Sequence, residues 1–126
     1  MAKSTLTDQS ATKSGEPYCP DRGDIIWLNF HPQAGREQDG WRPALVLSPK
    51  RYNQFARLCV ACPITSQDKL NNFQVELPDG CGVTGWVISD QVKSISWFDR
   101  ESQHRGRATD AVIAETVAKI RTLIPL

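Results

Sequence analysis

Residues 41–49, Trp-Arg-Pro-Ala-Leu-Val-Leu-Ser-Pro, carry the strongest structural signal of the chain. Residues 44–47 are all aliphatic, and a proline stands close to each end of this run. A short continuous apolar run of this kind predicts a central β-strand that is covered on both faces. Such a strand needs neighbours on either side, and the flanking sequence supplies them.

Further short segments with strand character surround this run and are separated by turn-forming residues. Residues 73–77 alternate apolar and polar side chains, which predicts a half-buried strand that ends at the turn Pro78-Asp79-Gly80. A short helical turn is expected at residues 50–53. The expected strands cover residues 24–30, 43–48, 58–62, 73–77, 85–89 and 92–97.

The last element differs, because its apolar residues recur at helical spacing. Thr109 or Asp110 can cap a helix, and Pro125 is expected to end it. The apolar stripe of this helix consists of Ile113, Val117, Ile120 and Ile124. About six or seven short strands and one terminal helix predict a mainly β protein, a small β-barrel with a C-terminal α-helix.

The chain of 126 residues has the size of one domain with a self-sufficient core. Residues 1–16 are polar and lack periodicity, which predicts a flexible N-terminal tail. The turn-rich residues 17–23 then open a single folded domain over residues 17–126. Residues 31–42 form a long polar connection between two strand-like runs, and loops of that length are usually functional or disordered.

Charge and hydropathy exclude several classes of protein. Lys plus Arg number 15 and Asp plus Glu number 14, so the net charge is +1. This balance argues against a protein that holds nucleic acid mainly by neutralising many phosphates. No apolar run is long enough to cross a bilayer, and the N-terminus has no secretory hydrophobic region. We therefore expect a soluble, cytoplasmic protein with no membrane partner.

Cysteine and histidine residues give little support for a metal site or a histidine-based catalytic pair. Cys59 and Cys62 form a C-x-x-C within an expected strand, where residues three apart point to opposite faces. We therefore expect free, structural thiols, no metal ligands and no cofactor. His31 and His104 lie in expected loops without a nucleophile signature beside them. The cysteines of the chain are Cys19, Cys59, Cys62 and Cys81.

Arg42 is the first candidate for chemistry, since it stands where the polar connection meets the buried run. Pro43 restricts Arg42 to an extended conformation, so the base of its side chain is anchored. A guanidinium held in this way can bind a phosphate through two hydrogen bonds and stabilise charge on its oxygens. A structural salt bridge from Arg42 to Glu37 or Asp39 is the alternative, and spacing alone leaves both open.

Two other segments gather polar side chains at the ends of expected strands. Residues 63–69 place Thr65, Ser66 and Lys69 after a strand that is expected to end at the first residue of the segment. This cluster can bind an anion, and an ordinary hydroxyl-capped turn is the alternative. Residues 89–94 interrupt two strand runs with polar side chains, for which a bulge or turn is the simpler interpretation.

Taken together, these segments resemble the MazF/PemK family of toxin endoribonucleases, the toxic halves of type II toxin–antitoxin pairs. The resemblance extends from about Pro17 to the C-terminus, and its motifs occur in the order of the family. The matching segments are Gly23-Asp24-Ile25-Ile26-Trp27-Leu28-Asn29-Phe30, Glu37-Gln38-x-Gly40-x-Arg42-Pro43-Ala44-Leu45-Val46-Leu47-Ser48-Pro49, Tyr52-Asn53, Pro63-Ile64-Thr65-Ser66 with Lys69, Phe73-x-Val75-x-Leu77, and Asp90-Gln91-Val92-Lys93-Ser94 with Trp97.

The resemblance implies an SH3-like barrel with a C-terminal helix, a homodimer and a cognate antitoxin as partner. It also implies sequence-specific, metal-independent cleavage of single-stranded RNA by attack of a 2′-hydroxyl on the adjacent phosphorus. The products would be a 2′,3′-cyclic phosphate and a free 5′-hydroxyl. By the same resemblance, Arg42 and Thr65 form the catalytic pair. Glu37 is chemically the easier general base, or else a partner that orients Arg42.

The resemblance also assigns an RNA groove. Aromatic side chains can stack on unpaired bases, and polar side chains can bind their edges. Trp41 and His31 depart from the residues usual in the family, so the cleaved sequence is not predicted. The basic segment 100–107 can contact RNA or an acidic antitoxin, or be a solvated loop. The groove residues are Asn29, Phe30, Ser66, Lys69, Gln91, Lys93 and Trp97.

Two alternatives belong to other classes of protein. One is a non-catalytic toxin that grips a protein, as gyrase-inhibiting toxins of this fold do, and the other is an RNA- or peptide-binding SH3-like module. Arg42 and Thr65, in their loop and strand-end contexts, are the features that favour the enzyme.

Overall fold

The structure is a computed structural model that describes residues 18–30 and 40–125. The expected tail over residues 1–16 and most of the expected loop over residues 31–42 lie outside the described residues. The elements are β1 (Asp24–Phe30), β2 (Gly40–Val46), α1 (Lys50–Ala56), β3 (Cys59–Thr65), β4 (Gln74–Glu76), β5 (Trp86–Ile88), the 3-10 turn η1 (Ser89–Gln91), β6 (Lys93–Ile95), β7 (Gln103–Arg107) and α2 (Asp110–Arg121).

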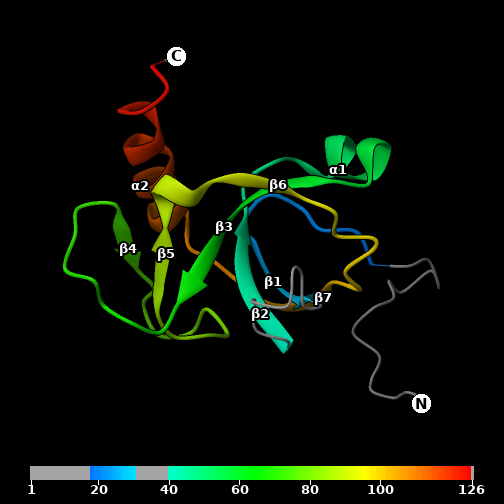
Figure 1. The fold of residues 1–126 in the computed structure, drawn as a ribbon, viewed down its shortest axis with the longest axis horizontal. Helices are drawn as coiled ribbons and strands as arrows, with labels where there is room; N and C mark the ends of the chain where they lie inside the picture. Colours follow the sequence, from blue (N-terminus) through cyan, green and yellow to red (C-terminus); the bar gives the residue numbers. More distant parts are fainter. Residues whose placement is uncertain (1–17, 31–39, 126) are drawn as a thin grey trace.

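The strands form one seven-stranded antiparallel sheet in the order β4-β5-β3-β2-β1-β7, and β6 pairs with β3 off this path. Because β3 pairs with β2, β5 and β6, it is the strand at which the sheet folds over on itself. Figure 1 shows α2 beside β4 and β5 at one side of the sheet and α1 beyond β6 at the other. The prediction of a mainly β, barrel-like fold with a C-terminal helix is confirmed. None of the helices among residues 18–30 and 40–125 is long and apolar enough to span a bilayer.

Two separate cores lie on the two faces of the central strands. The first is covered by Val112 and Ile113 of α2 and contains Cys62, whereas the second contains Cys59 and Trp97. The expectation that Cys59 and Cys62 point to opposite faces is therefore confirmed. All four cysteines are free and buried. Burial raises the pKa of the Cys59 and Cys62 thiols to about 12, because the thiolate would lose its hydration.

This burial makes stability dependent on alkaline pH. An unfolded chain releases both protons near the ordinary thiol value of 9.0, while the folded chain keeps them until about 12. The folded state thus binds more protons in this window, and the free energy of unfolding falls as pH rises through it. We expect a loss of roughly 1 kcal/mol per thiol between pH 7 and pH 10 in urea denaturation. In a Cys59→Ala/Cys62→Ala variant the decline should be shallower, and an equally steep decline would contradict the assignment.

Several boundaries differ from the sequence expectations. The short turn expected at residues 50–53 extends into the helix α1. The strand expected to end at Pro63 continues to Thr65, because Ile64 and Thr65 pair with Val87 and Trp86 of β5. The seventh strand, β7, was expected to be a loop. Its sequence, Gln-His-Arg-Gly-Arg, has no strand pattern of its own and becomes a strand because it pairs with β1. The expectation of a loop at His104 is wrong for the same reason.

The C-terminal helix begins as expected and ends earlier. Thr109 caps it, and its side chain accepts a hydrogen bond of 3.2 Å from the N–H of Val112. The helix ends at Arg121, before Pro125, so the expectation that Pro125 ends it is wrong. Ile124 lies beyond the last helical residue and is half exposed, so it does not belong to the apolar stripe of the helix.

Candidate active site

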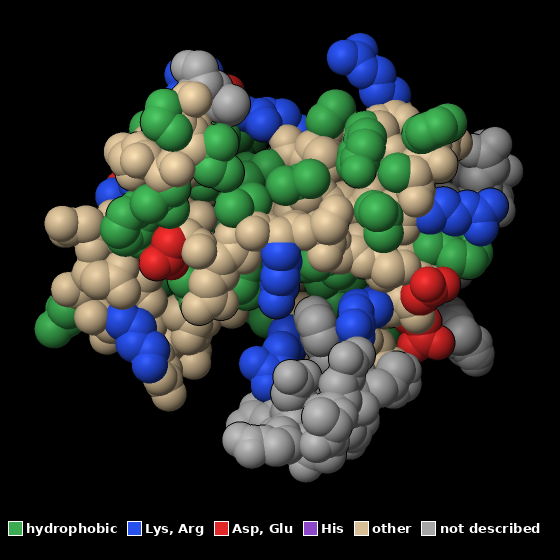
Figure 2. All heavy atoms as spheres, turned by 45° about the horizontal axis from the view of Figure 1, so that its top comes forward, with side chains coloured by type: hydrophobic (Ala, Val, Ile, Leu, Met, Phe, Trp, Pro, Cys, Tyr) green, Lys and Arg blue, Asp and Glu red, His purple; other side chains and the backbone are tan. Residues whose placement is uncertain are grey.

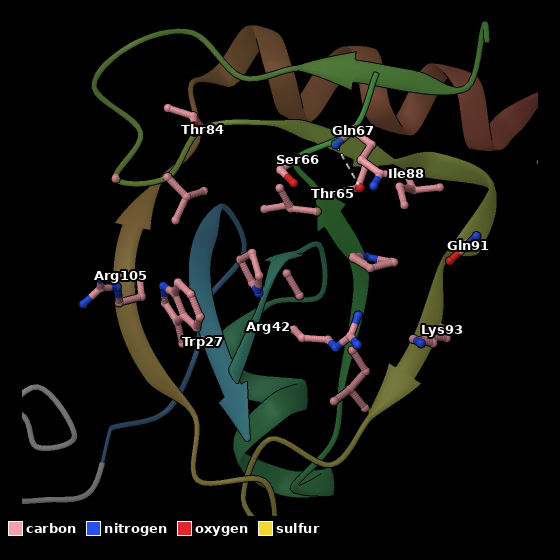
Figure 3. Close-up of a pocket in the computed structure, with 17 residues that line it drawn as sticks. Trp27, Arg42, Thr65, Ser66, Gln67, Thr84, Ile88, Gln91, Lys93 and Arg105 are labelled. Carbon is pink, nitrogen blue, oxygen red and sulfur yellow. Dashed lines mark hydrogen bonds between the residues drawn. The ribbon is translucent and has the colours of Figure 1, made fainter. Parts of the chain in front are cut away.

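A cleft of about 1010 Å³ opens on the sheet, and strands β1, β2, β3, β5, β6 and β7 all contribute side chains to it. Figure 3 shows Arg42 near its centre, with Thr65 and Ser66 at one end. Gln91 and Lys93 lie on one side of Arg42, and Trp27 and Arg105 lie on the other. Residues from distant parts of the chain therefore share one solvent-accessible space.

The end of the β2–β3 ladder explains why Arg42 and Thr65 line the same cleft. Ala44 pairs with Pro63 in the antiparallel ladder between β2 and β3. The ladder ends at this pair, and beyond it Thr65 pairs with Trp86 of β5 instead. The parts of β2 and β3 that carry Arg42 and Thr65 therefore no longer pair with each other, and both residues line the cleft. The cleft opens where this ladder ends, so both side chains project into open space.

The backbone at Arg42 is anchored on its other side as well. Arg42 pairs with Leu28 of β1, a fully buried core residue, and Pro43 pairs with Trp27. The expectation of an extended backbone at Arg42, just before Pro43, is confirmed by its place in β2. The side chain itself is exposed to solvent, so its base is fixed and its guanidinium is accessible.

Thr65 is oriented by its own loop. Its Oγ1 accepts a hydrogen bond of 3.1 Å from the N–H of Gln67, shown as a dashed line in Figure 3. A hydroxyl that accepts one hydrogen bond still has its own proton to donate. The Thr65 hydroxyl can therefore act as a donor toward a ligand in the cleft.

The charged side chains that line the cleft are all positive among the described residues. Arg42, Lys93 and Arg105 bring three cations to it, and no Asp, Glu, His or Cys lines it among the described residues. In the same part of the chain, no group of three or more such residues could hold a metal ion. The cleft thus offers N–H and O–H donors together with positive charge, which is the complement of a phosphate group.

The structure brings some of the expected site residues together and places others elsewhere. Trp97 is buried in the second core, where its indole N–H donates a hydrogen bond of 3.0 Å to the carbonyl of Asn53, so it does not face the cleft. Asn29 donates a hydrogen bond of 2.9 Å to Glu101, and Lys69 is exposed outside the cleft lining. The expected residues that do line the cleft are Arg42, Thr65, Ser66, Gln91 and Lys93.

Two expected site residues lie outside the described part of the chain. Glu37 belongs to residues 31–39, whose structure is not described. Phe30 ends strand β1, and its side chain is likewise outside the described part.

Two cleft residues, Trp27 and Arg105, were not expected there. Trp27 belongs to an apolar run that looked like core, and Arg105 belongs to the basic segment 100–107, for which contact with RNA or an antitoxin was one of the open alternatives. A basic and an aromatic residue that are far apart in the sequence indicate a binding site only when they are known to share a surface. The pairing of β1 with β7 places Trp27 and Arg105 side by side, and this pairing is not visible in the sequence.

The fold and the cleft define a small, mainly β protein with a cationic site for a phosphate group. Residues 21–124 match the family described as "PemK-like, MazF-like toxin of type II toxin-antitoxin system". The chain belongs to this family of toxins, as its sequence motifs predicted.

Individual relatives are similar over nearly their whole length. The endoribonuclease toxin MazF of Escherichia coli K12 is 43% identical over 107 residues, which is 85% of this chain and 96% of that protein. The endoribonuclease toxin ChpB of the same strain is 34% identical over 109 residues, 82% of this chain and 93% of that protein. A MazE-MazF crystal structure from Deinococcus radiodurans matches with a TM-score of 0.82 and 46% identity, covering 86% of this chain and 98% of that one.

Proposed function

We propose that this chain is the toxin of a type II toxin–antitoxin pair and cleaves single-stranded RNA at a short sequence without a metal ion. The observation that carries the proposal is the meeting of Arg42 and Thr65 in one cleft with Lys93 and without a described carboxylate. The two relatives named above are endoribonuclease toxins by name, which supports the same activity here. Cleavage of messenger RNA would take place in the cytoplasm and inhibit translation and growth.

The reaction begins with attack of a 2′-oxygen on the adjacent phosphorus. The new O–P bond closes the 2′,3′-cyclic phosphate as the bond to the 5′-oxygen breaks, and this oxygen takes up a proton to become a 5′-hydroxyl. Negative charge rises on the non-bridging oxygens during attack, and fixed donors aimed at them lower the barrier. Arg42 is the electrostatic donor in this scheme, and Thr65 hydrogen-bonds the scissile phosphate.

The proton of the 2′-hydroxyl must pass to a base. Arginine remains protonated at any physiological pH, so Arg42 is better suited to stabilise charge or to protonate the leaving oxygen. A carboxylate is the easier acceptor, and Glu37 is the candidate that we propose for this role. Gln91 and Lys93 complete the groove by binding the flanking nucleotides.

The proposal includes two protein partners. The MazF from Deinococcus radiodurans was crystallised together with MazE. We propose that this chain likewise binds a cognate antitoxin, and that the antitoxin covers the cleft.

A homodimer is the second part of the proposal. Figure 2 shows apolar side chains spread over the face that carries α1, β6 and α2. Phe55 of α1 is 89% exposed, and apolar surface of this kind marks interaction sites.

The proposal is tested by incubating the purified chain with a long single-stranded RNA in EDTA and mapping the 5′ ends of the products. We expect cleavage at one short sequence, with unchanged rates when the chelator is present. The products should accept phosphate from polynucleotide kinase without prior phosphatase treatment, because they carry 5′-hydroxyls. Absence of cleavage, or activity that returns only with added metal, would overturn the mechanism.

A further inference from the structure

Arg105 interrupts the regular pairing of β7 with β1. Ile25 pairs with Gly106 and Ile26 pairs with His104, so Arg105 is the extra residue of a β-bulge. A bulge bends its strand and re-aims a side chain, and bulges are over-represented beside active sites. Arg105 is the residue of β7 that lines the cleft, and in Figure 3 it lies at the rim, beyond Trp27, with its side chain pointing away from Arg42.

The two residues that follow Arg105 hold the bulge in place. Arg107 donates a hydrogen bond of 2.9 Å to the buried carboxylate of Asp24, and its backbone N–H donates one of 3.1 Å to the carbonyl of Cys81. Gly106 lies against the backbone of Cys81 and Gly82 so closely that a side chain would not fit. Arg105 is therefore a residue whose backbone position is fixed from both sides of the strand.

The side chain of Arg105 rests on an aromatic platform. Its guanidinium carbon lies over the ring of Trp27, 5.3 Å from the ring centre. The indole N–H of Trp27 is buried and has no hydrogen-bond partner among the described residues. Its ring face, which supports the guanidinium, is what the cleft uses.

Arg105 also differs from Arg107 of the same strand in its ion pairing. Arg107 forms an ion pair with Asp24, whereas Arg105 is exposed and forms no ion pair with any residue in ranges 18–30 and 40–125. Stacking on a ring occupies one face of a guanidinium and leaves the N–H groups at its edge available. These groups suit a phosphate, which accepts two parallel hydrogen bonds.

We propose that Arg105, supported by Trp27, binds a second phosphate of the RNA strand, on the side of Arg42 opposite Lys93. This inference rests on the proposed function, because it extends the RNA site beyond the scissile phosphate. Arg105 holds the strand and touches no reacting atom. The cleft then has three cationic contacts in a row, with the reactive one in the middle (Figure 3).

The test measures binding and its salt dependence. The probe is a fluorescent single-stranded RNA with the mapped cleavage sequence and a 2′-deoxyribose at the cleaved nucleotide, which removes the attacking hydroxyl. In the Arg105→Ala variant, Kd should rise about tenfold, which is the effect of one charged hydrogen-bonded contact. The slope of log Kd against log salt should fall by about 0.7, the value for one phosphate contact on a single strand.

Two matched variants separate this contact from net charge and from folding. Arg51→Ala removes the same charge from an exposed position on α1 outside the cleft, and it should leave Kd and the salt slope unchanged. Arg105→Lys keeps the charge and should keep the salt slope of the wild type. An Arg105→Ala variant that matches Arg51→Ala in both measurements would overturn the proposal.

The outcome is distinguishable from failure of the proposed function. If the wild type cleaves no RNA, the function is wrong, and the same comparison with a random-sequence single-stranded RNA pool still decides whether Arg105 binds a phosphate. Unchanged RNA binding together with weaker binding of an acidic antitoxin peptide would assign Arg105 to the antitoxin and overturn the proposal.

Discussion

The Arg42→Ala variant is expected to cleave single-stranded RNA about a hundred- to a thousandfold more slowly than the wild type, as loss of one fixed donor to a developing oxyanion typically does. The guanidinium is useful because the base of the side chain is held in β2, where Arg42 pairs with the buried Leu28 of β1. A donor held in advance needs no reorganisation when charge develops on the phosphate. Single-turnover cleavage of the mapped sequence measures the chemical step directly.

Arg42→Lys and Arg51→Ala are the controls for this loss. Lysine keeps the charge and loses the planar pair of donors, so Arg42→Lys should recover only part of the rate. Arg51→Ala changes the net charge equally at a position outside the cleft and should cleave at the wild-type rate. Because Arg42 is exposed and belongs to neither core, the melting temperature of the Arg42→Ala variant should change little. An Arg42→Ala variant within a few-fold of the wild type would rule out its catalytic role.

The Gly106→Ala variant is expected to lose about 3 kcal/mol or more of its free energy of unfolding, at the upper end of what overpacking causes. A Cβ at Gly106 would stand 1.8 Å from the carbonyl oxygen of Cys81 and 2.9 Å from the Cα of Gly82. Both are backbone atoms, which cannot turn aside as a flexible side chain can. The strand β7 and the loop at Cys81 would have to separate, and the hydrogen bond from Arg107 to Cys81 would break. Urea denaturation followed by tryptophan fluorescence measures the loss.

Gly80→Ala is the matched control in the same loop. A Cβ at Gly80 meets nothing within 4 Å, and only its φ of +95° disfavours an alanine. Gly80→Ala should therefore cost about 1–2 kcal/mol, the penalty for a left-handed backbone. Equal losses in the two variants would mean that close backbone approach is not what requires Gly106.

The second consequence of Gly106→Ala concerns the cleft. The loop that contacts Gly106 carries Gly82 and Thr84, which line the cleft. Displacing this loop should weaken RNA binding more than the loss of stability alone explains. Kd measured well below the unfolding transition, on the folded fraction, separates the two effects.

The sequence predicted those features that depend on neighbouring residues. The strand at residues 24–30, the helical turn after Pro49 and the cap at Thr109 follow from apolar patterning, turn residues and capping. The strand predicted at residues 43–48 exists as well, but it spans residues 40–46. The prediction of an extended backbone at Arg42 also succeeded, because Pro43 restricts it locally. The predictions failed where pairing with another strand decides the secondary structure. Residues 103–107 lack a strand pattern and become β7 only through pairing with β1.

The same limit explains the site. Family motifs named both Trp97 and Lys93 as groove residues, yet Lys93 lines the cleft while Trp97 is buried in the second core. Two residues on or near one strand can serve different surfaces, because the register and the end of each ladder decide where a side chain points. Sequence spacing does not contain that information.

From the amino-acid sequence alone one could establish a mainly β toxin of this family, with Arg42 and Thr65 as its candidate catalytic pair, since local patterns and ordered motifs are written along the chain. The three-dimensional arrangement was needed to place Arg42 and Thr65 in one cleft and to bring Arg105 to its rim. The physical reason is that strand register, a β-bulge and a close contact between two glycines are relations between backbone segments far apart in sequence. Their hydrogen bonds and steric limits exist only once those segments meet.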